Sequence, residues 1–130
     1  MPSRALLDRI VEVRQSGDAE ALRELYHPQA LICSALDPAA ARSRDETFAD
    51  ADVLRKVSFI GLSDVLPIDV TAGMIRASVR MRAATGYVVN DRTWLFSFVD
   101  GQIYRQRTLD SRAEAEALYA KHGLDLGLGG

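Results

Sequence analysis

The chain has 130 residues, of which 48% are hydrophobic and 26% are charged, and this is the composition of an ordinary globular domain that can bury a core. Its formal net charge of −2 argues against nucleic acid as a partner, and its single cysteine excludes an internal disulfide and any zinc-binding spacing. No apolar run is long enough to span a membrane and the N-terminus lacks a signal-peptide core, so we expect a cytoplasmic protein with no membrane partner, no metal and no cofactor.

The chain opens with the pattern of two helices. Apolar residues at helical spacing predict a helix over residues 3–15, which Gly17 ends. Asp18 can cap a second, short helix that includes Tyr26 and stops at Pro28.

A short strand and a third helix follow. Residues 30–34 have the composition of a strand. Ser43 and Glu46 form a capping box, which predicts a helix that begins there and runs to about residue 54.

The spacing of hydrophobic residues then changes from the helical period of about 3.6 residues to the period of two that is typical of strands. Residues 56–63 read as a strand, Pro67 interrupts the pattern before residues 68–70, and residues 74–84 alternate cleanly between apolar and polar side chains. Turns are predicted at Ala72-Gly73 and between Gly86 and Asn90-Asp91.

An Asp-Gly pair between two β-rich runs predicts a hairpin of residues 93–99 and 102–109. A two-residue turn would place Trp94 opposite Arg107. A three-residue loop, with Gly101 as a bulge at positive φ, would place Trp94 opposite Gln106. We favour the second register, because it gathers one wall of aromatic and mildly polar side chains: Trp94, Phe96, Phe98, Tyr104, Gln106 and Thr108.

The chain closes with a helix and a glycine-rich segment. Ser111 and Glu114 form a second capping box, for a helix that ends near His122. We expect one α+β domain over residues 1–123, with helices packed on one face of the sheet, and a loose tail over residues 124–130.

The order of these elements resembles the nuclear transport factor 2-like (NTF2-like) superfamily, in particular its SnoaL-like small proteins. The resemblance runs from about residue 6 to residue 118 and is carried by these segments: Gly17-Asp18-Ala19-Glu20-Ala21-Leu22, Leu25-Tyr26-His27-Pro28-Gln29-Ala30, Arg44-Asp45 and Trp94 to Ile103. It implies an α+β cone, in which a strongly curved mixed or antiparallel sheet wraps around the N-terminal helices, with a pocket at the open end. Such proteins include isomerases, dehydratases, cyclases, epoxide hydrolases and non-catalytic binding modules, often as dimers.

The family's catalytic residues are missing at the matching positions. Where the isomerases carry a tyrosine and two acids, this chain has Ile10, Ser34 and Trp94, and where the epoxide hydrolases carry an aspartate it has Thr108. Proton transfer needs a carboxylate or an imidazole, together with a donor for the oxyanion. The resemblance therefore excludes the family's usual isomerase and epoxide hydrolase mechanisms.

Two functions remain open. The first is a binding protein for a small, apolar to mildly polar molecule, or a lyase or isomerase with a non-standard acid–base set. Its catalytic candidates are Tyr26, His27, Tyr104 and Asp52. Its expected ligand-binding residues are Ile10, Tyr26, Ser34, Phe48, Trp94, Phe96, Phe98, Tyr104, Gln106 and Thr108.

The second function is a non-catalytic interaction module whose cone is filled by its own side chains. In either case we expect a homodimer through the outer face of the sheet. That face is expected to carry Leu95, Ile103 and the arginines Arg76, Arg80, Arg82, Arg105 and Arg107.

Overall fold

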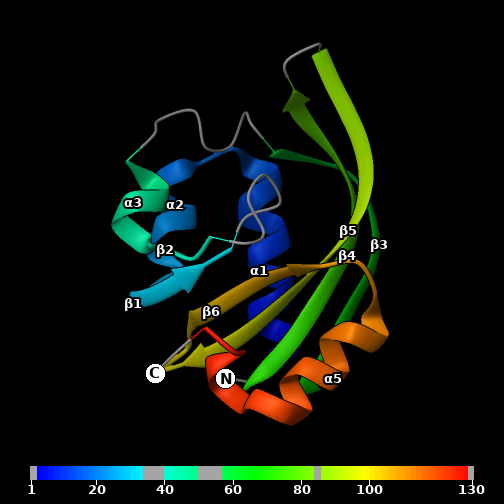
Figure 1. The fold of residues 1–130 in the computed structure, drawn as a ribbon. Coiled ribbons are helices and arrows are strands. Elements are labelled where there is room, and N and C mark those ends of the chain that lie inside the picture. Colours follow the sequence, from blue (N-terminus) through cyan, green and yellow to red (C-terminus); the bar gives the residue numbers. More distant parts are fainter. Residues whose placement is uncertain (1–2, 34–39, 50–56, 84–85, 129–130) are drawn as a thin grey trace.

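The computed structural model describes residues 3–33, 40–49, 57–83 and 86–128, and these form one curved sheet with helices on both of its faces (Figure 1). The α+β class predicted from the sequence is confirmed. In chain order the elements are α1 (Ser3–Ser16), α2 (Ala19–Glu24), β1 (Tyr26–Ile32), β2 (Arg42–Ser43), α3 (Arg44–Phe48), β3 (Val57–Asp69), β4 (Ala72–Ala83), β5 (Gly86–Val99), β6 (Gln102–Leu109), α5 (Arg112–His122) and the short 3₁₀ helix η1 (Gly123–Asp125).

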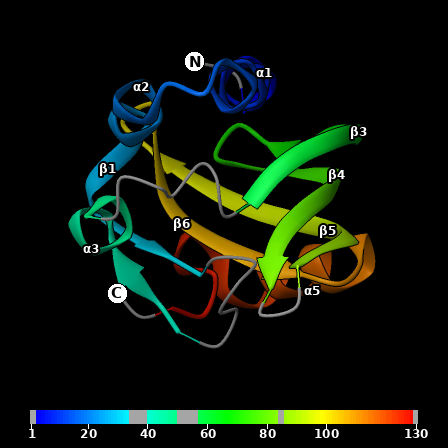
Figure 2. The same cartoon turned by 90° about the horizontal axis from the view of Figure 1, so that it is seen from above.

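The sheet is mixed, with the strand order β2-β1-β6-β5-β4-β3. Only the pair β1–β6 is parallel, while the other described neighbours run antiparallel. Seen from above, α1 lies inside the curve of the sheet and α5 lies on the opposite side (Figure 2). We call the side that faces α1 the concave face and the side that faces α5 the outer face.

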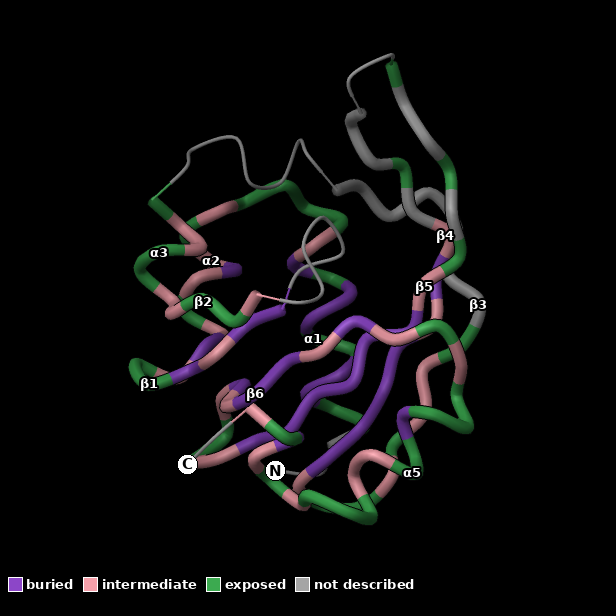
Figure 3. Tube along the Cα trace, in the orientation of Figure 1, coloured by how far each residue is buried: buried purple, intermediate pink, exposed green. Residues whose placement is uncertain are grey.

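The main core lies between α1 and the concave face. Leu7 and Ile10 of α1 pack with Ile75, Trp94 and Phe96 of the sheet, and all of these side chains are buried. The buried stretches of β5 and β6 form a continuous band across the molecule (Figure 3). Strand alternation places every second residue of β5 on this face, which is why Trp94, Phe96 and Phe98 form one row.

A second core lies on the outer face, where the sequence analysis expects a free surface for a dimer. Leu95 and Met74 are buried there against Ala115 of α5 and against Leu126. The prediction that helices cover only one face is therefore wrong. The amphipathic α5 needs an apolar surface to cover, and the outer residues of β4 and β5 supply it.

The segment after α5 is anchored, which corrects the expectation of a loose tail. Leu126 is fully buried, and its carbonyl accepts a hydrogen bond from Nη1 of Arg107 at 3.1 Å. Ser97 Oγ donates to the carbonyl of Leu124 at 2.6 Å. These contacts hold residues 123–128 on the outer face, although their glycines favour a flexible chain.

The hairpin of β5 and β6 differs from both predicted registers. Val99 lies opposite Gln102 across a two-residue turn in which Asp100 and Gly101 have φ of 54° and 75°. Positive φ at both positions suits the right-handed twist of the strands. The register then shifts after Phe98, so that Trp94 faces Thr108 instead of Arg107 or Gln106. The bulge that we placed at Gly101 thus lies next to Ile103, which turns inward to the core.

Three further predicted turns or strand ends differ from those in the structure, because pairing between strands decides them. Asn90 and Asp91 lie inside β5, because they pair with Val79 and Ser78. The turn expected at Ala72-Gly73 is formed by residues 70–71. Pro67 lies within β3, which is an edge strand of the sheet and therefore tolerates a residue without an amide hydrogen.

Both predicted serine caps are present, but only the first predicted capping box is complete. Ser43 and Glu46 make both bonds of a capping box at the start of α3. Ser111 caps α5 by accepting from the amide of Glu114 at 3.2 Å. α3 ends at Phe48 with Ala49 as its C-cap, and residues 50–54 of the predicted third helix lie outside the described residues.

Candidate functional site

A polar group is buried in the middle of the apolar concave face. Tyr26, the first residue of β1, points inward, and its hydroxyl donates a hydrogen bond to Oε1 of Gln106 in β6. Each of the two side chains is 2% exposed. The sequence placed Tyr26 on a helix, but β6 draws it into a strand: Tyr26 pairs with Ile103, whose amide donates to the carbonyl of Leu25 at 2.8 Å.

The environment of Tyr26 keeps its phenol protonated. Burial raises the pKa of Tyr26 above its ordinary value of 10.0, and the nearby guanidinium of Arg14 in α1 opposes this only in part. The ring packs against Phe48 of α3, with 5.5 Å between the ring centroids. At neutral pH Tyr26 is therefore a hydrogen-bond donor and not a base.

Gln106 uses only part of its hydrogen-bonding capacity within the described residues. Its Oε1 is occupied by Tyr26, but none of the described residues accepts a hydrogen bond from its amide nitrogen Nε2. The neighbouring polar group is satisfied, because Oγ1 of Thr108 donates to the carbonyl of Cys33 at 3.0 Å. Nε2 is therefore the donor on this face to which a ligand oxygen could bind.

The structure brings most of the predicted ligand-binding residues together on the concave face. Phe48 is half-buried beside Tyr26. Ser34 and the catalytic candidate Asp52 lie outside the described residues. The predicted ligand-binding residues that are buried on the concave face are Ile10, Tyr26, Trp94, Phe96, Phe98, Gln106 and Thr108.

His27 and Tyr104 do not reach that face, which corrects their expected place in the interior. His27 alternates with the inward-facing Tyr26, and its Nδ1 accepts a hydrogen bond from the amide of Gln29 at 3.0 Å. Tyr104 falls at the bulge of β6, and its ring lies edge-on to His27 and under the guanidinium of Arg105. The one-residue shift of the bulge is what separates Tyr104 from the aromatic row.

Two arginines that the sequence analysis did not select are near the site. Arg14 follows Ile10 by one helical turn and lies beside the Tyr26 phenol. Arg92 precedes Trp94 by two positions in β5 and so shares its face of the sheet. Both could have been found from their spacing to apolar residues that were already assigned to the interior.

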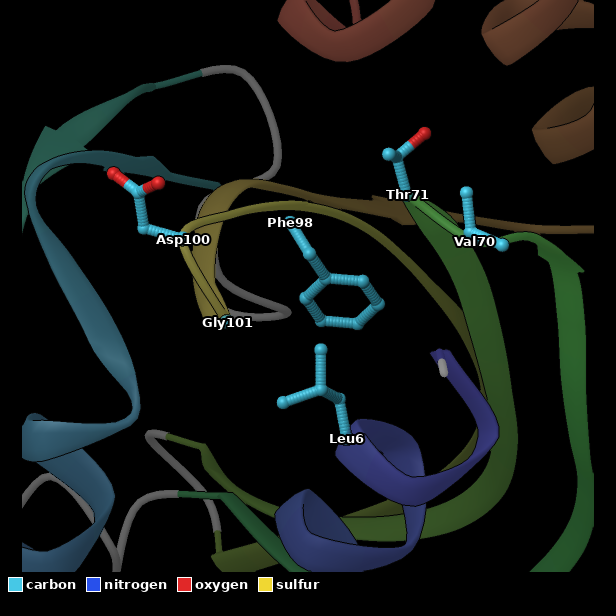
Figure 4. A pocket seen from close by; sticks show the side chains of 6 residues that line it. All are labelled: Leu6, Val70, Thr71, Phe98, Asp100 and Gly101. Atoms are coloured by element: carbon cyan, nitrogen blue, oxygen red, sulfur yellow. The ribbon is translucent and has the colours of Figure 1, made fainter. Parts of the chain in front are cut away.

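An open hollow of about 510 Å³ lies at the end of the molecule where α1 begins. Figure 4 shows Leu6 and Phe98 at its centre, with Asp100 and Thr71 at its rim. The hydroxyl of Thr71 is already bonded to Asp69 at 2.9 Å. Because its polar groups are exposed or already bonded, this hollow offers little to orient a ligand, and we assign no site to it.

The described part of the chain contains neither a helix that could span a membrane nor a cluster of metal-binding side chains. None of its helices is long and apolar enough to cross a membrane. Its histidine, cysteine and acidic side chains form no group of three or more that could hold a metal ion.

Comparisons with known proteins identify the fold. No family model matches the sequence, and no curated protein matches it significantly. Among solved structures, a candidate polyketide cyclase from Pseudomonas putida is 15% identical, with a TM-score of 0.67, and the alignment covers 87% of this chain and 94% of that one. An NTF2-like protein of unknown function from Burkholderia pseudomallei is 12% identical, with a TM-score of 0.67, and the alignment covers 91% and 98% of the two chains.

A third similar structure is SalBIII, an epoxide hydrolase/cyclase-like enzyme of pyran ring formation in the polyether salinomycin. It is 17% identical, with a TM-score of 0.63, and the alignment covers 85% of this chain and 92% of that one. The chain therefore has the NTF2-like fold, and the resemblance seen in the sequence is confirmed at the level of fold. At these identities the likeness does not extend to an activity.

Proposed function

We propose that this protein binds a small, largely apolar organic molecule on the concave face of its sheet, as a binding protein or as a SnoaL-like enzyme. The observation that carries the proposal is the amide of Gln106, which is buried on an apolar wall and has an Nε2 donor without an acceptor among the described residues. A core that only had to be filled could carry apolar side chains at both position 26 and position 106 without loss of stability.

The geometry suggests how such a ligand would be held. The hydrogen bond from Tyr26 fixes the orientation of the Gln106 amide, so that Nε2 is presented as a donor. A carbonyl or ether oxygen of the ligand would accept from Nε2, while Trp94 and Phe96 would contact the apolar body. The names of two of the similar structures, which refer to cyclases, are compatible with a ligand of this kind.

None of the catalytic candidates among the described residues is placed to act as a base on the concave face. Tyr26 is a donor, and His27 and Tyr104 face away from the concave face. Of the catalytic candidates, Asp52 alone keeps its proposed role as a proton acceptor, because it lies outside the described residues. We therefore propose binding as the basic function, with a lyase or isomerase reaction as an addition that depends on Asp52.

The alternative, an interaction module with a filled cone, has lost the two apolar residues of its predicted docking surface. Leu95 is buried beneath α5 and Ile103 is turned to the concave face. A homodimer stays a proposal, and of the predicted face Arg76 and Arg80 remain at least partly exposed for it.

A fluorescence titration with prodan, an apolar naphthyl ketone whose emission responds to its surroundings, tests the proposal. We expect saturable binding to the wild type and an affinity roughly 3- to 10-fold lower in Gln106→Leu, which loses one neutral hydrogen bond. Gln15→Leu, at an exposed position of α1, is the control and should bind like the wild type. Absence of prodan binding would favour the filled cone, and full affinity in a folded Gln106→Leu would remove Gln106 from the site.

A further inference from the structure

We infer that the ligand of the concave face is an anion, a flat apolar molecule with a carboxylate that is recognised by Arg92. This inference rests on the proposed function and adds the chemical class of its ligand. It is carried by the position and the contacts of Arg92, which the sequence analysis did not assign to any site.

The register of the sheet places Arg92 on the concave face. Its backbone pairs with that of Ala77, which is 1% exposed and belongs to the core beneath α1. Two residues further along β5, Trp94 lies in the same core. Since side chains two residues apart in a strand share a face, Arg92 continues the row of Trp94 and Phe96 and is half-buried there.

Arg92 has no counterion among the described residues. Its Nη1 donates to the backbone carbonyl of Asp91 at 3.0 Å. The carboxylate of Asp91 is on the outer face, where it accepts a hydrogen bond from Ser78 Oγ at 2.6 Å. Within the part of the chain that the structure describes, no Asp or Glu side chain is buried.

Among the described residues, a second cation lies near this face. The guanidinium of Arg14 lies beside the phenol of Tyr26, so α1 and β5 each bring positive charge to the same side of the sheet. A guanidinium can bind a carboxylate through two parallel hydrogen bonds, and such charge-assisted bonds are stronger than neutral ones. An apolar neutral ligand would leave Arg92 unused, whereas a carboxylate would pair with it.

The spacing of the two polar ends gives the approximate size of the ligand. Gln106 faces Phe96, which lies four positions after Arg92 in β5. At about 3.3 Å per residue the two polar ends are roughly 13 Å apart along the strand, and the long arginine side chain can shorten this distance. The ligand that fits has a ring system of about bicyclic size against Trp94, an acceptor oxygen at one end and a carboxylate at the other.

Displacement of prodan by naphthoate and by naphthamide tests this inference, because the two compounds share one ring system and differ in charge. We expect naphthoate to bind better to the wild type. In Arg92→Gln the affinity for naphthoate should fall roughly tenfold, while that for naphthamide is unchanged. Arg76→Gln is the matched control, since Arg76 pairs with Thr93 and faces outward from the neighbouring strand.

The outcomes separate this inference from the proposed function. If prodan binds but Arg92→Gln keeps the preference for naphthoate, the role of Arg92 is overturned and the binding site stands. If prodan does not bind to the wild type, both proposals fail. Should Arg92→Gln not fold, Arg92→Lys and a salt titration of the wild type take its place. Naphthoate affinity that does not fall with added salt, relative to naphthamide, would then overturn the inference.

Discussion

Gly73 in β4 lies against Leu7 of α1, and of the described glycines it leaves the least room for a side chain. Replacing Gly73 by alanine therefore tests how closely α1 packs on the concave face. A Cβ atom added at Gly73 would lie 2.5 Å from Cδ1 of Leu7 and 3.2 Å from its Cγ and Cδ2. Leu7 is fully buried, so its side chain has little room to move away. The φ of Gly73 is not positive, and alanine can therefore adopt the backbone conformation.

Two effects of opposite sign decide the outcome of Gly73→Ala. Removing the glycine restricts the unfolded chain, which would stabilise the protein by about 0.4–1 kcal/mol if the new methyl group met no neighbour. Inserting a methyl group into a well-packed core costs about 1–3 kcal/mol. Because the contact with Leu7 is far shorter than van der Waals distance, overpacking should win, and we expect a net loss of about 1 kcal/mol in the free energy of unfolding.

Urea unfolding followed by far-ultraviolet circular dichroism measures this loss. Leu7→Ala alone should cost about 2–5 kcal/mol, because it leaves a cavity beneath α1. In the double variant the methyl group of Ala at position 73 enters that cavity, so the combined loss should be smaller than the sum of the single losses. If Gly73→Ala is as stable as the wild type, or if the two losses are additive, α1 does not press on β4 as described.

Two further predictions concern buried and half-buried hydrogen bonds. Tyr26→Phe and Gln106→Leu should each lower the free energy of unfolding by about 1–3 kcal/mol, because each change leaves the other polar side chain buried without its partner. The double variant should lose less stability than the sum of the two single losses. Additive losses in urea unfolding would contradict the hydrogen bond between Tyr26 and Gln106. The second concerns Asp69, whose carboxylate accepts from the hydroxyl of Tyr119 at 2.8 Å. Partial burial acts to raise the pKa of Asp69, but hydrogen bonds from its neighbours outweigh it and hold the pKa below the ordinary 3.8. A lowered pKa stabilises the fold above that value, and the contribution is lost as the pH falls below about 4. Thermal unfolding should therefore depend less on acid in Tyr119→Phe, and an equal acid dependence in both proteins would contradict this role of the hydrogen bond.

The features that the sequence determined by itself are those that depend on near neighbours along the chain. Ser43 and Ser111 cap helices because their hydroxyls reach amides three residues ahead. Asp100-Gly101 forms a turn because both residues tolerate positive φ. The order of these elements, together with the family's short motifs, was sufficient to predict the α+β class and the NTF2-like fold.

Pairing between distant segments decided what the sequence left open. Tyr26 and Gln106 are 80 positions apart, and their hydrogen bond exists only because β1 and β6 run side by side in parallel. Nothing near Tyr26 in sequence marks it as a strand residue, since a tyrosine after an amphipathic stretch suits a helix equally well.

The tertiary structure also decided which face each side chain occupies. A single extra residue in β6 turned Tyr104 outward and Ile103 inward, which no local pattern predicted. The fold likewise covered Leu95 with α5 and left Arg92 on the concave face. The physical reason is that side chains alternate along a strand, so a shift by one residue reverses the face, and only packing against α1 and α5 selects between the two registers.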